Sequence, residues 1–147
     1  MQLIKLTPDL IVNSWEDIEA ALTEAIPTTI GPIEDRNSRV LESLLIGRMD
    51  CWVKCKDDGK IVFFVLTAII DDPEAGSRSI LIYLLYGYLP PTIVEMNETL
   101  EFGKLYAKEK KCNRIVAYSN NENVIVIANR LGADTSVRFI AFPVDLP

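Results

Sequence analysis

The chain has 147 residues, of which 49% are hydrophobic and 24% are charged, a composition typical of globular proteins. This length is sufficient for one ordinary domain and too short for two, so we expect a single domain over residues 1–147. Fifteen basic and 21 acidic residues give a net charge of -6, which argues against a nucleic-acid partner and against attraction to an anionic membrane.

The histidine and cysteine content excludes several kinds of chemistry. Because the chain has no histidine, it cannot form a Ser-His-Asp or Cys-His pair or a metal site that uses imidazole. Three cysteines, Cys51, Cys55 and Cys112, are an odd number for a disulfide framework. We therefore expect free thiols, no bound metal and a reducing compartment.

The N-terminal residues and the apolar stretches predict a cytoplasmic protein with no membrane partner. Residues 1–8 lack the apolar segment and the cleavage site of a secretion signal. The longest apolar stretches, 61–70 and 80–89, are about half as long as a helix that crosses a bilayer. These two stretches are therefore predicted to be buried strands.

The first third of the chain predicts one short strand and two helices. The strand covers residues 2–6. Ser14 is the predicted N-cap of the first helix, which ends at Ile26 because Pro27 follows. After a loop at 28–37, an apolar stripe and a final glycine predict the second helix over 38–47.

The middle of the chain predicts three antiparallel strands. Two strands, 51–56 and 60–70, flank the Asp57-Asp58-Gly59 sequence, and Asp-Gly is favoured in hairpin turns because both residues tolerate a positive φ. After a turn at 71–79, a third strand is predicted over 80–89.

A long helix is predicted to begin at Pro90-Pro91, since a first-turn proline loses no helical hydrogen bond. Gly103 lies in the middle of this helix and predicts close packing on a sheet, because glycine there costs about 1 kcal/mol relative to alanine. The predicted inner stripe consists of Ile93, Met96, Leu100, Gly103 and Ala107.

The last part of the chain contains one ambiguous segment between two predicted strands, 114–119 and 137–144. The Val124-Ile125-Val126-Ile127 sequence has the composition of a strand, whereas the spacing of its apolar residues suits a helix. Asn121 as N-cap and Gly132 as C-terminal cap favour the helix. The chain thus predicts a mixed α/β (α+β) fold with a mostly antiparallel sheet, in the order strand, helix, helix, three strands, helix, strand, helix, strand.

This order resembles the fold of the GCN5-related N-acetyltransferases (GNAT family), over residues 3–144. The segments 105–112 and 114–118 are similar to the end of the family's central helix and the strand after it, and Asn121 and Gly132 match the residues that bracket its last helix. The resemblance implies an acetyl-coenzyme A site where the fourth strand meets the central helix. In the family, a Gln/Arg-x-x-Gly-x-Gly/Ala loop wraps the diphosphate there.

The corresponding stretch, residues 88–95, departs from the family's loop because it has no glycine and no basic residue. Pro90 and Pro91 carry no N–H group, although the loop's role is to donate N–H groups to an anion. Ile93 and Val94 add β-branched bulk, and Glu95 adds a charge that would repel a diphosphate. This stretch predicts weak or absent cofactor binding.

A second departure concerns catalysis. Family members commonly place a tyrosine acid four residues before the glycine of the last helix and a phenylalanine after it, where this chain has Ala128 and Ala133. Four tyrosines and three acidic residues remain as acids or bases, but no motif places any of them in a catalytic role. These are Tyr83, Tyr86, Tyr88, Tyr118, Asp71, Asp72 and Glu74.

Two functions are compatible with these patterns. In the first, the protein has lost acetyl-coenzyme A and catalysis and acts through a protein partner or self-association; residues 61–65 are the candidate interface, unless both faces of that strand are buried. The stretch 100–144 is similar to small acetyltransferase-like proteins of tailed phages, which implies a virion component made in a bacterial cytoplasm. In the alternative, the protein is an active N-acetyltransferase whose cofactor-binding residues include Leu89, Thr92 and Asn121.

Overall fold

A computed structural model describes residues 3–26, 31–89, 92–119 and 121–146. Its contacts divide the chain into two compact units, Met1–Ala117 and Tyr118–Pro147. The single domain expected from the length stays a prediction. Within the described residues, no helix combines the length and the apolar character needed to cross a bilayer.

The first unit contains five strands and three helices in the predicted order. The strands are β1 (Leu3–Lys5), β2 (Met49–Cys55), β3 (Ile61–Asp72), β4 (Ser77–Gly87) and β5 (Arg114–Ala117). The helices are α1 (Pro8–Ala25), α2 (Ile33–Leu45) and α3 (Ile93–Glu109).

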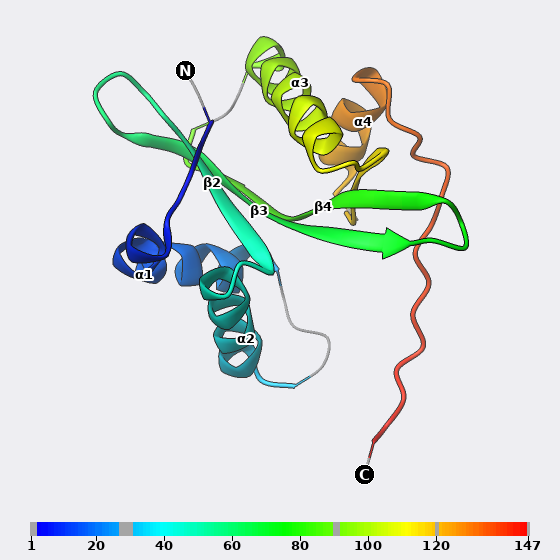
Figure 1. The fold of residues 1–147 in the computed structure, drawn as a ribbon, viewed down its shortest axis with the longest axis horizontal. Helices are drawn as coiled ribbons and strands as arrows, with labels where there is room; N and C mark the ends of the chain where they lie inside the picture. The colour runs from blue at the N-terminus through cyan, green and yellow to red at the C-terminus, as the bar shows by residue number, and fades with distance from the viewer. Residues whose placement is uncertain (1–2, 27–30, 90–91, 120, 147) are drawn as a thin grey trace. The chain divides into compact units, whose positions relative to one another are not determined.

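The five strands form one mixed sheet in the order β1-β2-β3-β4-β5. The first three pairings are antiparallel, and β4 pairs with β5 in parallel. Helices α1 and α2 cover one face of this sheet and α3 lies on the other (Figure 1). The predicted mixed, mostly antiparallel fold is therefore confirmed.

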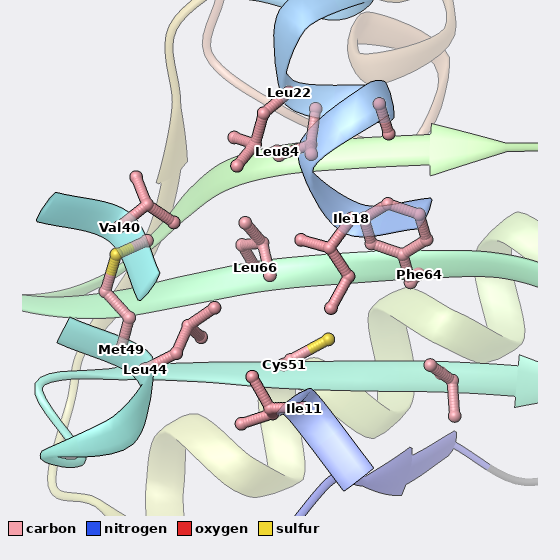
Figure 2. Close-up of a cluster of buried hydrophobic side chains, with 12 residues drawn as sticks. Ile11, Ile18, Leu22, Val40, Leu44, Met49, Cys51, Phe64, Leu66 and Leu84 are labelled. Atoms are coloured by element: carbon pink, nitrogen blue, oxygen red, sulfur yellow. The ribbon is translucent and has the colours of Figure 1, made fainter. Parts of the chain in front are cut away.

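The main core lies between the sheet and the pair α1 and α2. Side chains from both helices and from β2, β3 and β4 meet there, as Figure 2 shows. Leu22 of α1 and Leu66 of β3 are fully buried, and Phe64 and Leu84 are nearly so. Because β3 and β4 pair Leu66 with Leu84, the alternation of the strands places both on this face.

The opposite face of the sheet packs against α3. Trp52 of β2 makes edge-to-face contacts with Phe102 and Tyr106 of α3, with ring centroids 5.6 and 4.8 Å apart. A Cβ atom placed on Gly103 would lie 3.3 Å from Cδ1 of Ile115 in β5, so the close packing predicted for this glycine is confirmed.

Both N-terminal helices begin earlier than predicted. Helix α1 starts at Pro8, where the Thr7 hydroxyl accepts a hydrogen bond from the Leu10 N–H at 3.4 Å, so Ser14 is an interior residue and not the N-cap. Helix α2 starts at Ile33, and residues 33–37 of the predicted loop are helical. The first error came from choosing Ser14 as the cap over the earlier Pro8, which suits a first helical turn. In α2, Pro32 is the N-cap and the helix begins directly after it.

The structure decides one open alternative and overturns one prediction of burial. Residues 62–65 of β3 are buried on both faces, so the strand at 61–65 is core and not an interface; only Ile61 is exposed. Conversely, Ile93 was placed on the inner stripe of α3 but is 52% exposed. It is the first residue of α3.

The second unit contains helix α4 (Glu122–Arg130). The Asn121 side chain accepts hydrogen bonds from the Asn123 and Val124 N–H groups, and Gly132 adopts a φ of 95°, so the choice of helix for this segment is confirmed. The strand predicted over 137–144 is not formed: residues 133–146 have no regular structure, and no strand of the described residues pairs with them. Strand composition alone does not produce a strand without a partner backbone.

Candidate functional site

The candidate site lies where β4 and β5 part and α3 begins. The parallel ladder runs from Ser79 opposite Arg114 to Ile82 opposite Ala117, and there it ends. Strand β4 continues to Gly87, so its last five residues have no described strand on the β5 side. The main-chain groups of this free edge are available to a ligand or to another extended segment.

A β-bulge marks the point of parting. Leu66 and Thr67 of β3 face Leu84 and Ile82 of β4, so Tyr83 is the extra residue of the bulge. Tyr83 and Leu84 both pack against the core under α1 and α2. Leu85 therefore lies on the α3 face, where it is 53% exposed. Bulges of this kind commonly re-aim side chains beside binding sites.

The start of α3 is closed by a capping box. Thr92 Oγ1 accepts a hydrogen bond from the Glu95 N–H at 3.1 Å, and Glu95 Oε1 accepts a long one from the Thr92 N–H at 3.5 Å. The Thr92 hydroxyl also lies 3.1 Å from Glu95 Oε1. The chain's own hydroxyl and carboxylate thus serve as the acceptors at this helix end.

This geometry does not fit a bound diphosphate, the group that the fold implies at this place. The amides of Ile93 and Val94 are the first-turn donors that have no partner among the described residues, but the Glu95 carboxylate lies at the same helix end. The positive end of the helix dipole is already matched by this charge, and a second anion would be repelled. Pro90 and Pro91, whose missing N–H groups were the other reason for predicting weak cofactor binding, lie outside the described residues.

The three predicted cofactor residues are placed differently. Leu89 follows β4 and Thr92 precedes α3, so both flank the candidate site, and both are exposed. Asn121 belongs to the second unit, where its side-chain oxygen caps α4. Ala128 and Ala133 belong to the same unit; the N–H of Ala133 donates to the carbonyl of Ala128.

Two of the three acidic candidates, Asp71 and Asp72, have structural partners, and no contact is described for the Glu74 side chain. Asp71 forms an ion pair with Arg78 at 3.1 Å across the β3–β4 hairpin, and Asp72 Oδ1 accepts a hydrogen bond from the Ala75 N–H in the same turn. Tyr118, in the second unit, packs its ring against Phe139 with centroids 5.0 Å apart. None of these residues is placed beside the end of β4 by a described contact.

Tyr86 and Tyr88, by contrast, form a cluster with α1 that the sequence patterns missed. The Tyr86 hydroxyl donates to Glu24 Oε2 at 2.7 Å, and this hydrogen bond is the main reason that the pKa of Tyr86 is raised. Burial, followed by the charge of Asp17, raises the pKa of Tyr88. The contact joins residues 62 positions apart, so local spacing could not reveal it.

Metal and thiol chemistry find no support in the described part of the chain. No group of three or more acidic or cysteine side chains is arranged to hold a metal ion there. All three cysteines are free thiols, as predicted. Burial and the adjacent Asp50 raise the pKa of Cys51 to about 12, which keeps this thiol protonated and unreactive at neutral pH.

The fold is similar to that of solved acetyltransferases. A probable acetyltransferase matches all of both chains with a TM-score of 0.74 and 12% identity. A ribosomal-protein-alanine N-acetyltransferase from Brucella melitensis biovar Abortus 2308 has a TM-score of 0.71 and 13% identity, covering 98% of this chain and all of its own. AAC(6')-Iy, solved in complex with the bisubstrate analog CoA-S-monomethyl-acetylneamine, has a TM-score of 0.69 and 14% identity over 99% of this chain and 98% of its own.

These likenesses show the architecture and not the activity, because the identities are low. No protein-family model matches the chain, and no curated protein matches it. The GNAT fold expected from the order of the elements is therefore supported by the structure, while the state of the cofactor site depends on the residues described above.

Proposed function

We propose that this protein keeps the acetyltransferase architecture, does not use acetyl-coenzyme A, and acts through contacts with another macromolecule. The capping box of α3 carries this proposal. Thr92 Oγ1 and the Glu95 carboxylate accept from two of the N–H groups at this helix end, and Glu95 places a negative charge where the fold would otherwise hold a diphosphate. Each charge-assisted hydrogen bond that is lost costs about 1.5–3 kcal/mol, so losing two weakens cofactor binding about a hundredfold or more.

Titration of the full chain with acetyl-coenzyme A by calorimetry tests the proposal. We expect no binding tighter than about 50 μM, which corresponds to roughly -6 kcal/mol. Tighter binding, or release of coenzyme A thiol in the presence of an amine, contradicts the proposal.

A gain-of-binding variant tests the physical reason. In Pro90→Gly/Pro91→Gly/Glu95→Gly, two main-chain donors are restored and the carboxylate is removed. We expect this variant to bind acetyl-coenzyme A at least tenfold more tightly than the natural chain. The matched control is Pro90→Gly/Pro91→Gly/Glu98→Gln, which keeps Glu95 and removes one negative charge farther along the same helix. The control should gain less affinity for acetyl-coenzyme A.

A second candidate function, an active N-acetyltransferase, is favoured by the parting of β4 from β5 and by the bulge at Tyr83. The free main-chain edge beyond Ile82 is able to pair with an extended ligand. Under this alternative, Leu89 and Thr92 flank the bound cofactor. The same calorimetric titration decides between the two functions.

The more specific form of the proposal is a structural role in a tailed-phage particle, which rests on the resemblance of residues 100–144 to phage-encoded proteins. Such a protein would be synthesised in the cytoplasm of a bacterial host and found in the virion. Mass spectrometry of purified particles tests this form: a fixed number of copies per particle supports it, and absence from the particles rejects it. Size-exclusion chromatography with light scattering tests self-association independently.

A further inference from the structure

Two tyrosines at the end of β4 form an aromatic corner on the face of the sheet that α1 covers. The rings of Tyr86 and Tyr88 have centroids 5.2 Å apart and planes inclined by 77°. Both rest on Phe64, which is 2% exposed, with centroid distances of 5.7 and 6.3 Å. The buried ring fixes the corner from below, while 47% of Tyr88 remains exposed to solvent.

Carboxylates of α1 stand beside this corner. Glu24 accepts the hydrogen bond from the Tyr86 hydroxyl, and the charge of Asp17 adds to burial in raising the pKa of Tyr88. Both carboxylates belong to exposed residues, two helical turns apart on α1. Helix α1 carries acidic residues at Asp9, Glu16, Asp17, Glu19 and Glu24 and no lysine or arginine.

The position of Glu24 is locally unfavourable for a carboxylate. It lies in the last turn of α1, where the dipole is negative and a basic residue is usual. Arg36 reaches this helix end, but it donates to the Leu22 carbonyl at 3.0 Å and to Asn37 at 2.9 Å. Arg36 therefore offsets the negative end of the helix, whereas the Glu24 and Asp17 carboxylates have no ion-pair partner among the described residues.

If the protein acts through macromolecular contacts, as proposed above, this surface identifies the chemistry of the partner. We propose that Asp17, Glu24, Tyr86 and Tyr88, here called the aromatic–acidic surface, bind a lysine- or arginine-bearing segment of a partner protein. The electron-rich ring faces and the two carboxylates attract the same cationic group. The apolar stem of a lysine or arginine side chain suits the exposed ring of Tyr88.

Calorimetry of the full chain with a peptide of alternating lysine and glycine tests the surface. We expect binding that weakens with added salt and no binding of the same peptide with acetylated lysines, because acetylation removes the charge. Asp17→Asn/Glu24→Gln should weaken binding about tenfold, and Tyr88→Leu about threefold to fivefold.

Glu98→Gln/Glu109→Gln is the matched control. It removes two carboxylates from exposed residues of α3, on the opposite face of the sheet. If this control weakens peptide binding as much as Asp17→Asn/Glu24→Gln does, the peptide is attracted only by the net charge of the protein, and the proposal is overturned. It is also overturned if the lysine peptide does not bind at millimolar concentration. Urea unfolding of each variant establishes that it is folded.

The two proposals fail in different ways. Acetyl-coenzyme A binding by the natural chain contradicts the proposed function and leaves the aromatic–acidic surface as a site for a cationic molecule. Failure of the lysine peptide with no coenzyme A binding rejects the aromatic–acidic surface and leaves the proposed function intact.

Discussion

Gly103 of α3 lies so close to Ile115 of β5 that an added Cβ would approach Ile115 Cδ1 to 3.3 Å. This distance is tighter than most Cβ contacts but involves the far end of a side chain that is only half-buried. The contact sets how closely α3 packs on the edge strand beside the candidate site.

Gly103→Ala is expected to change the free energy of unfolding by less than about 1 kcal/mol. Alanine gains about 1 kcal/mol of helix propensity, and displacement of the Ile115 methyl group offsets part of this gain. In an Ile115→Val background, which lacks Cδ1, the same substitution should be more stabilising. Urea unfolding of the four proteins in this cycle measures the difference. Equal effects in both backgrounds would show that the contact has no energetic weight.

Arg36→Met is expected to lower the free energy of unfolding by about 1–3 kcal/mol. Arg36 is 8% exposed and ties α2 to the last turns of α1 through the Leu22 carbonyl, while Asn37 donates to Thr23 Oγ1. Methionine fills similar volume but leaves buried acceptors without donors. Arg39→Met, an exposed arginine one turn along α2, is the control and should change stability by less than about 0.5 kcal/mol. Equal losses for the two variants would contradict the assignment.

Cys51→Ala is expected to change how stability depends on pH in the alkaline range. The folded chain raises the thiol pKa from 9.0 to about 12, so the folded state holds this proton more tightly than the unfolded state. Stability due to this group is complete below pH 9 and is lost as pH rises toward 12, by up to about 1.4 kcal/mol per pH unit. Unfolding curves at several pH values between 9 and 12 measure this loss. The free energy of unfolding should fall more steeply with pH for the natural chain than for the variant, which has no thiol at this position. Parallel profiles would contradict the burial of the thiol, and Cys112→Ala controls for loss of another buried thiol.

The sequence predicted the features that depend on local chemistry. The Asp57-Asp58-Gly59 turn joins the predicted strands because Gly59 adopts a φ of 86°. Asn121 caps α4 as predicted. The two capping residues, an asparagine before the helix and a glycine after it, were a stronger signal than the strand-like composition of residues 124–127. Signals of this kind lie within a few residues of one another and need no tertiary contact.

Features that depend on distant contacts were not predictable from these patterns. The hydrogen bond between Glu24 and Tyr86 requires α1 and β4 to be packed together, which no local spacing encodes. Leu89 and Thr92 were predicted from the family resemblance, as cofactor residues of the alternative function, and remain a prediction, whereas the bulge at Tyr83 depends on the register between two strands. A strand at 137–144 was expected from composition, whereas strands require a partner backbone.

Hydrogen exchange tests the absence of that strand. Residues 137–146 have no regular structure, and Val137, Phe139 and Phe142 are each more than 70% exposed. We therefore expect the amides of this segment to exchange near the rate of an unstructured peptide, while those of β3 are strongly protected. The amides of α4, which form helical hydrogen bonds, are the internal comparison within the second unit. Protection of alternate amides between 137 and 144 would contradict the irregular structure and restore the predicted strand, because a strand at the edge of a sheet protects every second amide.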